Sequence, residues 1–369
     1  MSDQSVWAEI DLGAIEHNVR QIRKITETHT QICAVVKADA YGHGAVAVAR
    51  AALHAGADRL AVANISEALQ LRQAGFTTPI LILGYTPECQ ARTVVDYNIT
   101  QTVFSIDTAR ALSEAAVATG KVSNVHIKID TGMGRIGICP AEAGNFATVV
   151  ANLPGIKIEG VFSHFAASDS SDKTFTYEQY GRFTEAVQSI KEAGISIPIR
   201  HIANSAAILD LPHMHLDMVR AGIILYGLWP SNEVEKKIQL KPAMKLKTQV
   251  AFVKELPANA SISYGRTYFT PKASRIATLP VGYADGWSRL LANKASVFME
   301  GRRAPLVGRV CMDQCMIDIT HIPRVITGDE VVLFGNEDLP VEEIAEWMGT
   351  INYEIICMIG KRVPRVYVG

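Results

Sequence analysis

A lysine near the N-terminus follows a strongly apolar run, at a position where its amine could act as a nucleophile. Lys37 comes directly after residues 32–36, Ile-Cys-Ala-Val-Val. Partial burial lowers the pKa of a lysine, because desolvation disfavours the charged form. A neutral amine can form a Schiff base with an aldehyde. Position alone favours a simpler interpretation, in which Lys37 extends to solvent or pairs with Asp39.

Other reactive side chains follow further apolar runs in the same way. The residues found just past these runs are Asn64, Tyr85, Asp130, Arg135, His164, Asn204, Ser205 and Arg220. They would lie together if the runs were parallel strands of a barrel, because active sites in that fold lie at the carboxyl ends of the strands. Taken alone, Arg220 would be interpreted as an ion-pair partner of Asp217.

Two alternating patterns in the first two-thirds of the chain predict the elements that carry these residues. Short β-branched runs alternate with Ala-rich helical segments, several of which stop at glycine. The runs occupy residues 32–36, 60–62, 80–83, 99–104, 125–129, 156–162, 197–202 and 216–219. About eight strand–helix units predict an α/β fold, a (β/α)8 barrel resembling the TIM barrel, over residues 1–232. An open doubly wound sheet is the alternative.

The pattern changes after residue 232. Strand-like runs, including residues 244–256, follow one another between glycine and proline turns, and only 341–348 predicts a clear helix. We therefore expect a second, mainly β domain over residues 233–369, joined through the charged segment 231–237. The first ten or so residues are expected to pack with this domain.

Composition and charge exclude several classes of protein. The formal net charge is -1, with 36 basic and 37 acidic residues, so no electrostatic surface for nucleic acid or an anionic membrane is expected. No apolar run approaches the roughly 18 residues of a spanning helix, and the N-terminus shows no secretion signal. We expect a cytoplasmic protein. The six scattered cysteines predict buried free thiols rather than disulfides or a zinc site.

One glycine-rich segment favours a different activity. Residues 132–137 match the dinucleotide-binding pattern G-x-G-x-x-G after a predicted strand, and Glu159 lies near the place of a ribose-binding acid. Arg135 lies inside this loop, however, and the following helix is expected only near Pro140. An oxidoreductase that uses NAD is therefore a remote alternative.

Motifs along nearly the whole chain resemble those of the bacterial alanine racemase family, whose enzymes depend on pyridoxal phosphate. Residues 36–44, Val-Lys-Ala-Asp-Ala-Tyr-Gly-His-Gly, resemble the segment to which the cofactor is attached. Further family motifs follow in the expected order at residues 126–135, 162–165, 201–205, 219–222, 263–268, 281–286, 308–313 and 351–354. The resemblance implies a barrel followed by a β domain, as the residue patterns also predict.

The resemblance further implies an interconversion of L-alanine and D-alanine by two bases. Lys37 would hold the cofactor and act as one base, and Tyr264 would act as the other from the opposite face of the substrate. A racemase needs both, because one group removes the α-proton and another returns it from the other side. A network through His164 and Arg220 would tune Tyr264. The active unit would be a homodimer in which Tyr264 reaches the cofactor of the partner subunit.

Binding roles follow from the same resemblance. Cofactor binding is implied for Lys37, Tyr41, His164, Asn204, Ser205, Arg220, Gly222, Ile223 and Tyr353. Substrate binding is implied for Arg135 and Met312, and supporting roles for Lys128, His201, Tyr283, Cys311 and Asp313. Lys128 matches a lysine that is carbamylated in some members. The product D-alanine would serve as a cell-wall precursor, although a catabolic role fits equally.

Three alternatives share the cofactor. A serine or broad-specificity racemase is disfavoured because Tyr353 would restrict the pocket, yet one hydroxymethyl group is worth only about 1–3 kcal/mol. Amino-acid decarboxylases pair a similar barrel with a β domain, but they are not expected to carry the segment at Tyr264 or an arginine at 220. Single-barrel proteins that only bind the cofactor lack residues 233–369.

Overall fold

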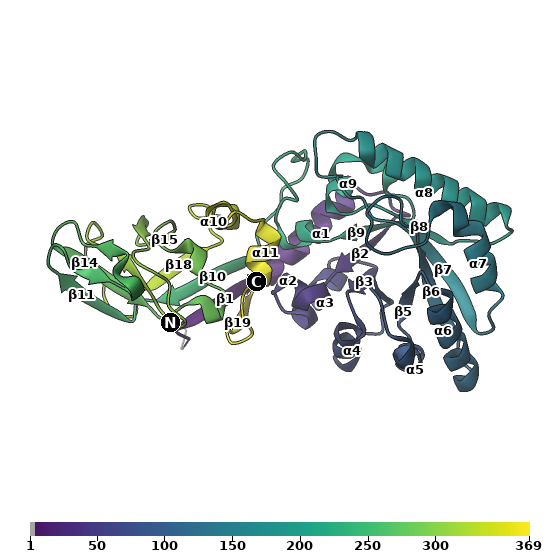
Figure 1. Cartoon of the computed structure of the whole chain (residues 1–369), viewed down its shortest axis with the longest axis horizontal. Coiled ribbons are helices and arrows are strands. Elements are labelled where there is room, and N and C mark those ends of the chain that lie inside the picture. The colour runs from purple at the N-terminus through teal and green to yellow at the C-terminus, as the bar shows by residue number, and fades with distance from the viewer. Residues whose placement is uncertain (1–3) are drawn as a thin grey trace. The chain divides into compact units, whose positions relative to one another are not determined.

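The computed structural model describes residues 4–369 and divides the chain into two compact units. The barrel unit comprises residues 14–40 and 45–241. The β unit comprises residues 242–369, the segment Tyr41–Gly44 and the described residues up to Gly13 (Figure 1).

Eight parallel strands form the barrel unit. Their order is β8-β7-β6-β5-β4-β3-β2-β9, and each neighbouring pair is parallel. Backbone hydrogen bonds from Asp217 N to Arg200 O and from Arg220 N to Ala203 O join the last strand to β8 and close the barrel. The strands are β2 (Gln31–Val35), β3 (Arg59–Val62), β4 (Ile80–Ile82), β5 (Thr100–Val103), β6 (Ser123–Lys128), β7 (Ile156–Phe162), β8 (Ile199–His201) and β9 (Met218–Ala221). The predicted barrel is confirmed.

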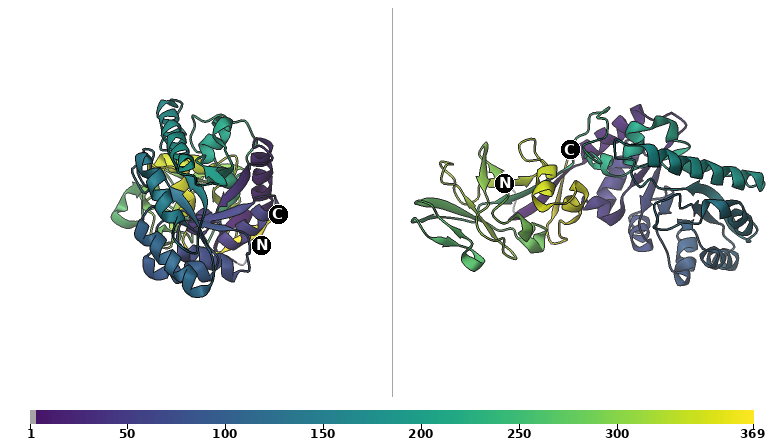
Figure 2. Two further views of the ribbon diagram at one scale, coloured as in Figure 1. Left: turned by 90° about the vertical axis from the view of Figure 1, so that its right-hand side faces the viewer. Right: turned by 45° about the horizontal axis from the view of Figure 1, so that its top comes forward.

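Helices surround these strands, as the alternating pattern predicts (Figure 2). α6 is one example: Ser105 caps its N-terminus, and Gly120, with φ of 64°, ends it in the left-handed conformation that glycine adopts at low cost. The helices of this unit are α1 (Leu12–Lys24), α2 (Lys37–Tyr41), α3 (Ala45–His54), α4 (Ile65–Gln73), α5 (Ala91–Asp96), α6 (Ile106–Thr119), α7 (Ala143–Ala151), α8 (Thr174–Glu192) and α9 (Ser205–Asp210). α1 starts within the β unit and α2 ends there.

The β unit contains three sheets. A six-stranded sheet has the order β16-β15-β18-β10-β1-β19, a three-stranded sheet the order β11-β14-β17, and β12 pairs with β13. The strands are β1 (Val6–Asp11), β10 (Met244–Gln249), β11 (Phe252–Leu256), β12 (Ser261–Ile262), β13 (Tyr268–Phe269), β14 (Ser274–Leu279), β15 (Ser296–Met299), β16 (Arg302–Pro305), β17 (Cys315–Asp318), β18 (Glu330–Phe334) and β19 (Arg365–Val368). The N-terminal strand β1 pairs with β10 and β19.

Three details differ from the sequence prediction. Residues 244–256 form two strands in different sheets rather than one, because the backbone bonds of Val250 and Ala251 go to Asp329 and Thr278. Besides the predicted helix α10 (Val341–Met348), the β unit has a short helix, α11 (Asn352–Cys357). Its β-branched isoleucines obscure the helical pattern. The cysteines are unpaired, but Cys89, Cys139 and Cys357 are exposed rather than buried.

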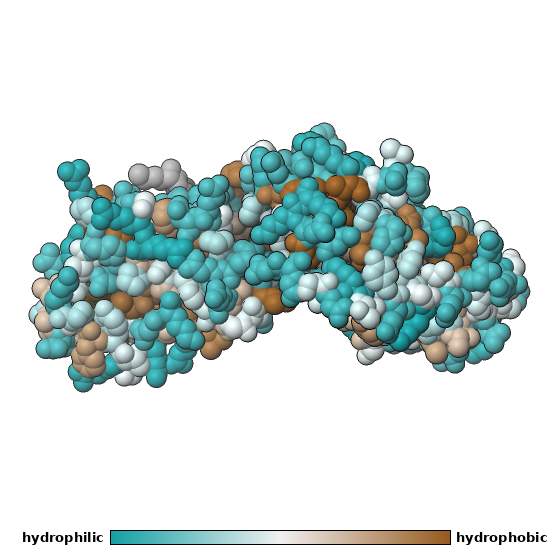
Figure 3. Space-filling view, turned by 90° about the horizontal axis from the view of Figure 1, so that it is seen from above, coloured by the Kyte–Doolittle hydropathy of each residue, from teal (hydrophilic) through white to brown (hydrophobic). Residues whose placement is uncertain are grey.

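One face of the molecule is mostly hydrophilic, and the described chain contains no membrane-crossing helix. Hydrophilic residues cover most of the face drawn in Figure 3, and hydrophobic ones form scattered groups. No helix within residues 4–369 is both long and apolar enough to cross a bilayer.

Candidate active site

Lys37 begins a turn with unusual handedness. It follows β2 and starts α2, in which Ala38, Asp39 and Ala40 have φ and ψ values near +50°. Tyr41 also has a positive φ of 53°. Left-handed backbone costs about 1–2 kcal/mol per residue without glycine, so tertiary contacts must hold the turn. One of them is the hydrogen bond from Ala38 N to the Glu67 carboxylate, 2.7 Å long.

Arg220, on β9, lies fully inside the barrel unit and makes four hydrogen bonds. Its Nη1 donates to His201 Nδ1 at 2.8 Å. Its Nη2 donates to the carbonyl oxygens of Ser163 and Ile202, both at 2.9 Å, and to His164 Nδ1 at 3.2 Å. Burial lowers the pKa of Arg220 from 12.5 to about 10. The guanidinium therefore stays charged at neutral pH. The predicted pairing with Asp217 is wrong, because Asp217 binds Arg200 at 2.7 Å.

Positive charge accumulates around His164. Burial lowers the pKa of His164 well below its usual value, and the charges of Arg220, Lys128, Arg135 and Lys37 lower it further. These four cations come from the ends of β9, β6 and β2 and from the loop after β6. His164 is therefore neutral. Its surroundings suit a ligand that carries several negative charges.

Lys128 is buried within this group of cations. Its Nζ lies 4.5 Å from the centre of the Phe162 ring. Burial, followed by the charges of Arg220 and Arg135, lowers the pKa of Lys128 well below its usual value. A lowered pKa makes the neutral amine, the form that carbamylation requires, easier to reach.

Two short helices begin side by side at the same end of the barrel. The Asn204 side chain caps α9 by accepting from Ala207 N at 3.1 Å, and it also accepts from Ser168 Oγ at 2.8 Å. Ser205 Oγ accepts from Gly222 N at 3.1 Å. Gly222 in turn precedes the 3-10 helix Ile223–Tyr226. Hydroxyl and backbone N–H groups at helix starts are suited to bind phosphate.

The glycine-rich loop that carries Arg135 is shaped by a carboxylate. The amides of Gly132 and Gly134 donate to Asp130 Oδ1 at 3.0 and 3.1 Å. Arg135 itself is exposed. The acid expected to bind a ribose, Glu159, instead binds Arg59 through both of its oxygens at 2.9 and 3.0 Å. The loop amides and Glu159 are thus used internally, which argues against dinucleotide binding.

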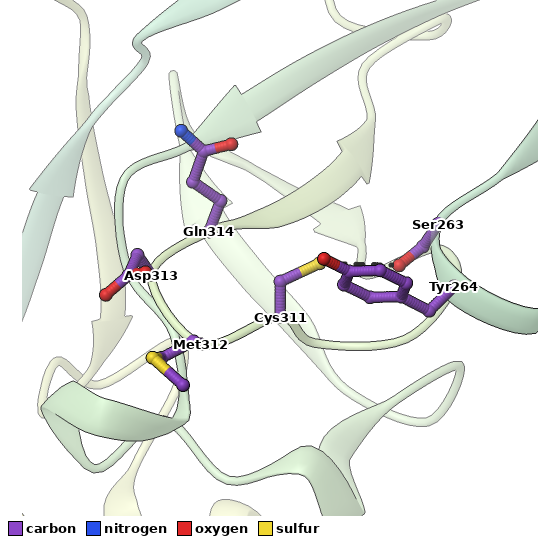
Figure 4. Close-up of a pocket in the computed structure, with 6 residues that line it drawn as sticks. All are labelled: Ser263, Tyr264, Cys311, Met312, Asp313 and Gln314. Carbon is purple, nitrogen blue, oxygen red and sulfur yellow. Dashed lines mark hydrogen bonds between the residues drawn. The ribbon is translucent and has the colours of Figure 1, made fainter.

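The other predicted residues lie in the β unit. Tyr264, Cys311, Met312 and Asp313 line one pocket together with Ser263 and Gln314 (Figure 4). The Ser263 hydroxyl lies 3.6 Å from the Cys311 thiol and donates to Arg309 O at 2.6 Å. Tyr264 is 70% exposed and Met312 53% exposed. The pocket therefore presents a phenol and a thioether on an accessible surface.

Three further tyrosines belong to the β unit. Tyr283 N donates to Cys311 O at 3.1 Å, which attaches the Tyr283 turn to the pocket. Tyr41 and Tyr353 lie with their ring centres 6.2 Å apart. Burial raises the pKa of Tyr41, so its hydroxyl remains a neutral hydrogen-bond donor.

Two residues that connect to Arg220 through His201, the buried His126 and the partly buried Glu159, were not assigned to the site from the sequence. His126 Nδ1 lies 2.8 Å from His201 Nε2, and His126 Nε2 lies 3.1 Å from Glu159. Polar residues within otherwise apolar strands, as in Val-His-Ile-Lys and Ile-Lys-Ile-Glu, were the available signal. The sequence does not show that the two strands bring His126 and Glu159 together.

The barrel unit fits pyridoxal phosphate by its set of donors. A lysine amine, a neutral and partly buried histidine and several cations gather where the hydroxyl of Ser205 and the amides of two helix starts also lie. Such a set matches an anionic aldehyde with a phosphate. Fold and site together define a barrel enzyme that uses pyridoxal phosphate.

Comparison with known proteins identifies the family. Residues 10–230 match the family described as alanine racemase, N-terminal domain, and residues 243–367 match alanine racemase, C-terminal domain. Alanine racemase from Desulfovibrio desulfuricans is 56% identical over 366 residues, with 99% of each chain covered. The chain belongs to the alanine racemase family, a family of isomerases.

Solved structures agree with this assignment. Alanine racemase from Clostridium difficile 630 has a TM-score of 0.96 at 44% identity, with 100% of this chain and 97% of that chain covered. Alanine racemase from Bacillus anthracis with bound L-Ala-P has a TM-score of 0.94 at 41% identity, with 100% and 96% covered.

Proposed function

We propose that this protein interconverts L-alanine and D-alanine with pyridoxal phosphate as cofactor. The observation that carries this proposal is the grouping of Lys37, Arg135, Lys128 and Arg220 around the neutral His164. Four cations accommodate both a phosphate and a substrate carboxylate. When bound, the cofactor supplies an electron sink that stabilises negative charge at the substrate α-carbon.

Several residues would hold the cofactor. Lys37 would bind it covalently through its amine. The Ser205 hydroxyl and the backbone N–H groups of Gly222 and Ile223 would bind the phosphate. The family resemblance adds Tyr41 and Tyr353 to the phosphate site, with His164 and Asn204 placed around the cofactor.

Arg220 would contact the cofactor's ring nitrogen. Its four hydrogen bonds to described residues all come from Nη1 and Nη2. The Nε–H is therefore a donor that could serve a ligand. A guanidinium with a pKa of about 10 donates a hydrogen bond but does not give up its proton at neutral pH. The ring nitrogen would stay unprotonated, which favours rapid reprotonation of the α-carbon over transamination.

Lys37 and Tyr264 would be the two bases. The Lys37 amine would remove or return the α-proton on one face of the substrate, and the Tyr264 hydroxyl would do so on the other. Arg135 and the backbone at Met312 would bind the carboxylate, while Lys128, His201, Tyr283, Cys311 and Asp313 would support these groups. Tyr353 would limit the pocket to the methyl side chain of alanine.

The exposed phenol of Tyr264 supports a homodimer with shared sites. In a single chain this side chain lies on an accessible surface of the β unit, where it makes no hydrogen bond within the described residues. A second copy would provide the Lys37, Arg135 and Arg220 that it serves. A reducing compartment such as the cytoplasm fits the six unpaired cysteines.

The circular dichroism of L-alanine, followed over time with the cofactor-loaded protein, tests this function. We expect the signal to decay to zero without loss of amino acid. A constant signal with alanine would contradict the proposal. Parallel assays with serine, lysine and arginine would then identify a racemase of another specificity, and release of carbon dioxide would identify a decarboxylase. Lys37→Ala is the matched inactive control.

A further inference from the structure

A continuous chain of hydrogen bonds runs from Arg220 through the interior of the barrel unit. Arg220 Nη1 donates to His201 Nδ1 at 2.8 Å, and His201 Nε2 lies 2.8 Å from His126 Nδ1. His126 Nε2 lies 3.1 Å from Glu159 Oε2, and both Glu159 oxygens accept from Arg59. Arg59 is the first residue of β3 and Arg220 lies near the end of β9. The chain therefore runs between opposite ends of the strands.

The two ends of this chain determine where the protons lie. Arginine has only donors, so His201 Nδ1 must be an unprotonated acceptor. A neutral His201 then carries its proton on Nε2 and donates it to His126 Nδ1. A neutral His126 likewise carries its proton on Nε2 and donates it to Glu159, which only accepts when ionised. Every hydrogen bond between Arg220 and Glu159 thus points toward Glu159, and the opposite arrangement would set an N–H against the guanidinium.

The local structure is built to hold these rings. β7 has an irregularity opposite Val125 and His126, where Ile158 and Gly160 are paired and Glu159 is the extra residue. Gly160 provides the space for the His126 ring, since a Cβ there would lie 2.7 Å from two ring atoms. Phe162 stacks on His201 with ring centres 4.7 Å apart and planes 4° apart. These contacts place both rings for the hydrogen bonds described above.

The protonation states agree with this geometry. Burial lowers the pKa of His126 and, more strongly, that of His201, so both are neutral near pH 7. Burial alone would raise the pKa of Glu159, but hydrogen bonds from His126 and Arg59 lower it to about 2. Glu159 is therefore ionised, as the direction of the chain requires.

We propose that Glu159 is a positioning residue, which holds His126 and His201 in their Nε2–H forms so that His201 Nδ1 accepts from Arg220 and fixes the orientation of its guanidinium. The effect of Glu159 on catalysis rests on the role proposed above for Arg220. The proposed positions of the protons on His126 and His201 do not depend on that role. Glu159 belongs to the barrel interior and acts only through the two rings.

Nitrogen-15 NMR of the protein labelled at histidine tests the proton arrangement without any assay of activity. We expect both His126 and His201 in the wild-type protein to show a protonated Nε2 and an unprotonated Nδ1 at pH 7. Either ring in the Nδ1–H form, or as an imidazolium, would overturn the inference. This measurement needs no variant, so it holds even if substitutions at Glu159 prevent folding.

The Glu159→Gln substitution tests whether Glu159 influences His201 and Arg220 through the chain of hydrogen bonds. The amide keeps the shape but removes the charge, which weakens the bond from His126 and, through it, the bond from His201. We expect the Nε2–H proton signals of both rings to move upfield. For the cofactor-loaded enzyme we expect kcat for alanine to fall about tenfold, about 1.4 kcal/mol in barrier, with KM unchanged because Glu159 is remote from substrate.

Asp217→Asn is the matched control. Asp217, just before β9, also pairs with an arginine, Arg200 on β8, and its hydrogen bonds with the described residues do not include either histidine. The Asp217→Asn substitution should leave the NMR signals of both histidine rings and kcat unchanged. A shift confined to His126, an unchanged kcat, or an equal loss in Asp217→Asn would overturn the positioning role. If the wild-type protein fails to racemise alanine while both rings respond to Glu159→Gln, the proposed function falls and the proton arrangement stands.

Discussion

The candidate site residues of the barrel unit and those of the β unit differ in how completely the chain surrounds them. Arg220, His201 and Lys128 are buried, and Arg220 alone makes four hydrogen bonds. Tyr264 and Met312 are exposed. The barrel unit thus surrounds these three groups by itself, whereas the β unit presents Tyr264 and Met312 on an accessible surface. Under the proposed homodimer, the exposed half of the site is the one that a second subunit would complete.

Complementation between inactive variants gives the largest expected effect. Lys37→Ala should lose racemisation and the visible absorbance of bound cofactor, whereas Tyr264→Phe should keep the absorbance and lose racemisation. If each site combines Lys37 of one subunit with Tyr264 of the other, a mixed dimer holds one intact site. Coexpression of the two variants should then restore about a quarter of wild-type activity, because about half of the dimers are mixed.

Two outcomes would contradict this picture. Activity that stays at the level of the separate variants would mean that both bases come from one chain. Full activity of Tyr264→Phe alone, in both directions, would remove Tyr264 from the reaction. Reduction with borohydride gives a check on Lys37: a cofactor still fixed covalently in Lys37→Ala would refute its assignment.

Substitutions in the barrel unit and in the β unit should differ in their effect on the free energy of unfolding. Arg220→Met leaves the acceptors on His201, Ser163, Ile202 and His164 without their buried donor, which should cost about 3 kcal/mol in the free energy of unfolding. Tyr264→Ala removes an exposed side chain and should change that free energy by less than about 0.5 kcal/mol. Urea unfolding of the protein without cofactor measures both. Equal losses would show that Tyr264 is already packed within a single subunit.

The pH dependence of the free energy of unfolding tests whether the barrel unit buries its titratable groups as described. Burial lowers the pKa of His126, His164 and His201, so the folded protein leaves them neutral when the unfolded chain binds protons. Stability should therefore fall as pH decreases below about 6.5, by up to about 1.4 kcal/mol per pH unit for each histidine. Glu159, with a pKa of about 2, adds a further loss between about pH 4.5 and 2. Urea unfolding at pH 7.5 and 5.5 would contradict this if the two free energies were equal.

The barrel, and many of the residues at the carboxyl ends of its strands, were predictable because they depend on the local pattern of apolar and helical segments. Alternating β-branched and Ala-rich segments specify strands and helices, and the residue after each strand falls at one end of the barrel. Lys37, His164 and Arg220 were found in this way, with the family motifs adding their roles. Their proximity is visible in the charges that act on His164.

The remaining features depend on contacts between distant residues. Glu159 reaches His126 only because β7 contains an extra residue and Gly160 leaves space for the ring. The spacing of apolar and polar residues in the sequence does not indicate such an irregularity in β7. The pairing of Asp217 with Arg200 rather than Arg220 likewise follows from strand closure, which joins Asp217 N to Arg200 O.

The left-handed turn after Lys37 links the chemistry of the protein to the completeness of its folding. Residues 38–41 hold an energetically unfavourable conformation without a glycine among them, and the chain passes there from the barrel unit to the β unit. Contacts such as that from Ala38 N to Glu67 maintain it, and these exist only once α4 has docked. A partly folded chain would release the turn and misdirect the lysine amine. Under the proposed role of Lys37, nascent or damaged copies would fail to capture the aldehyde, and cofactor retention would report native structure at this position.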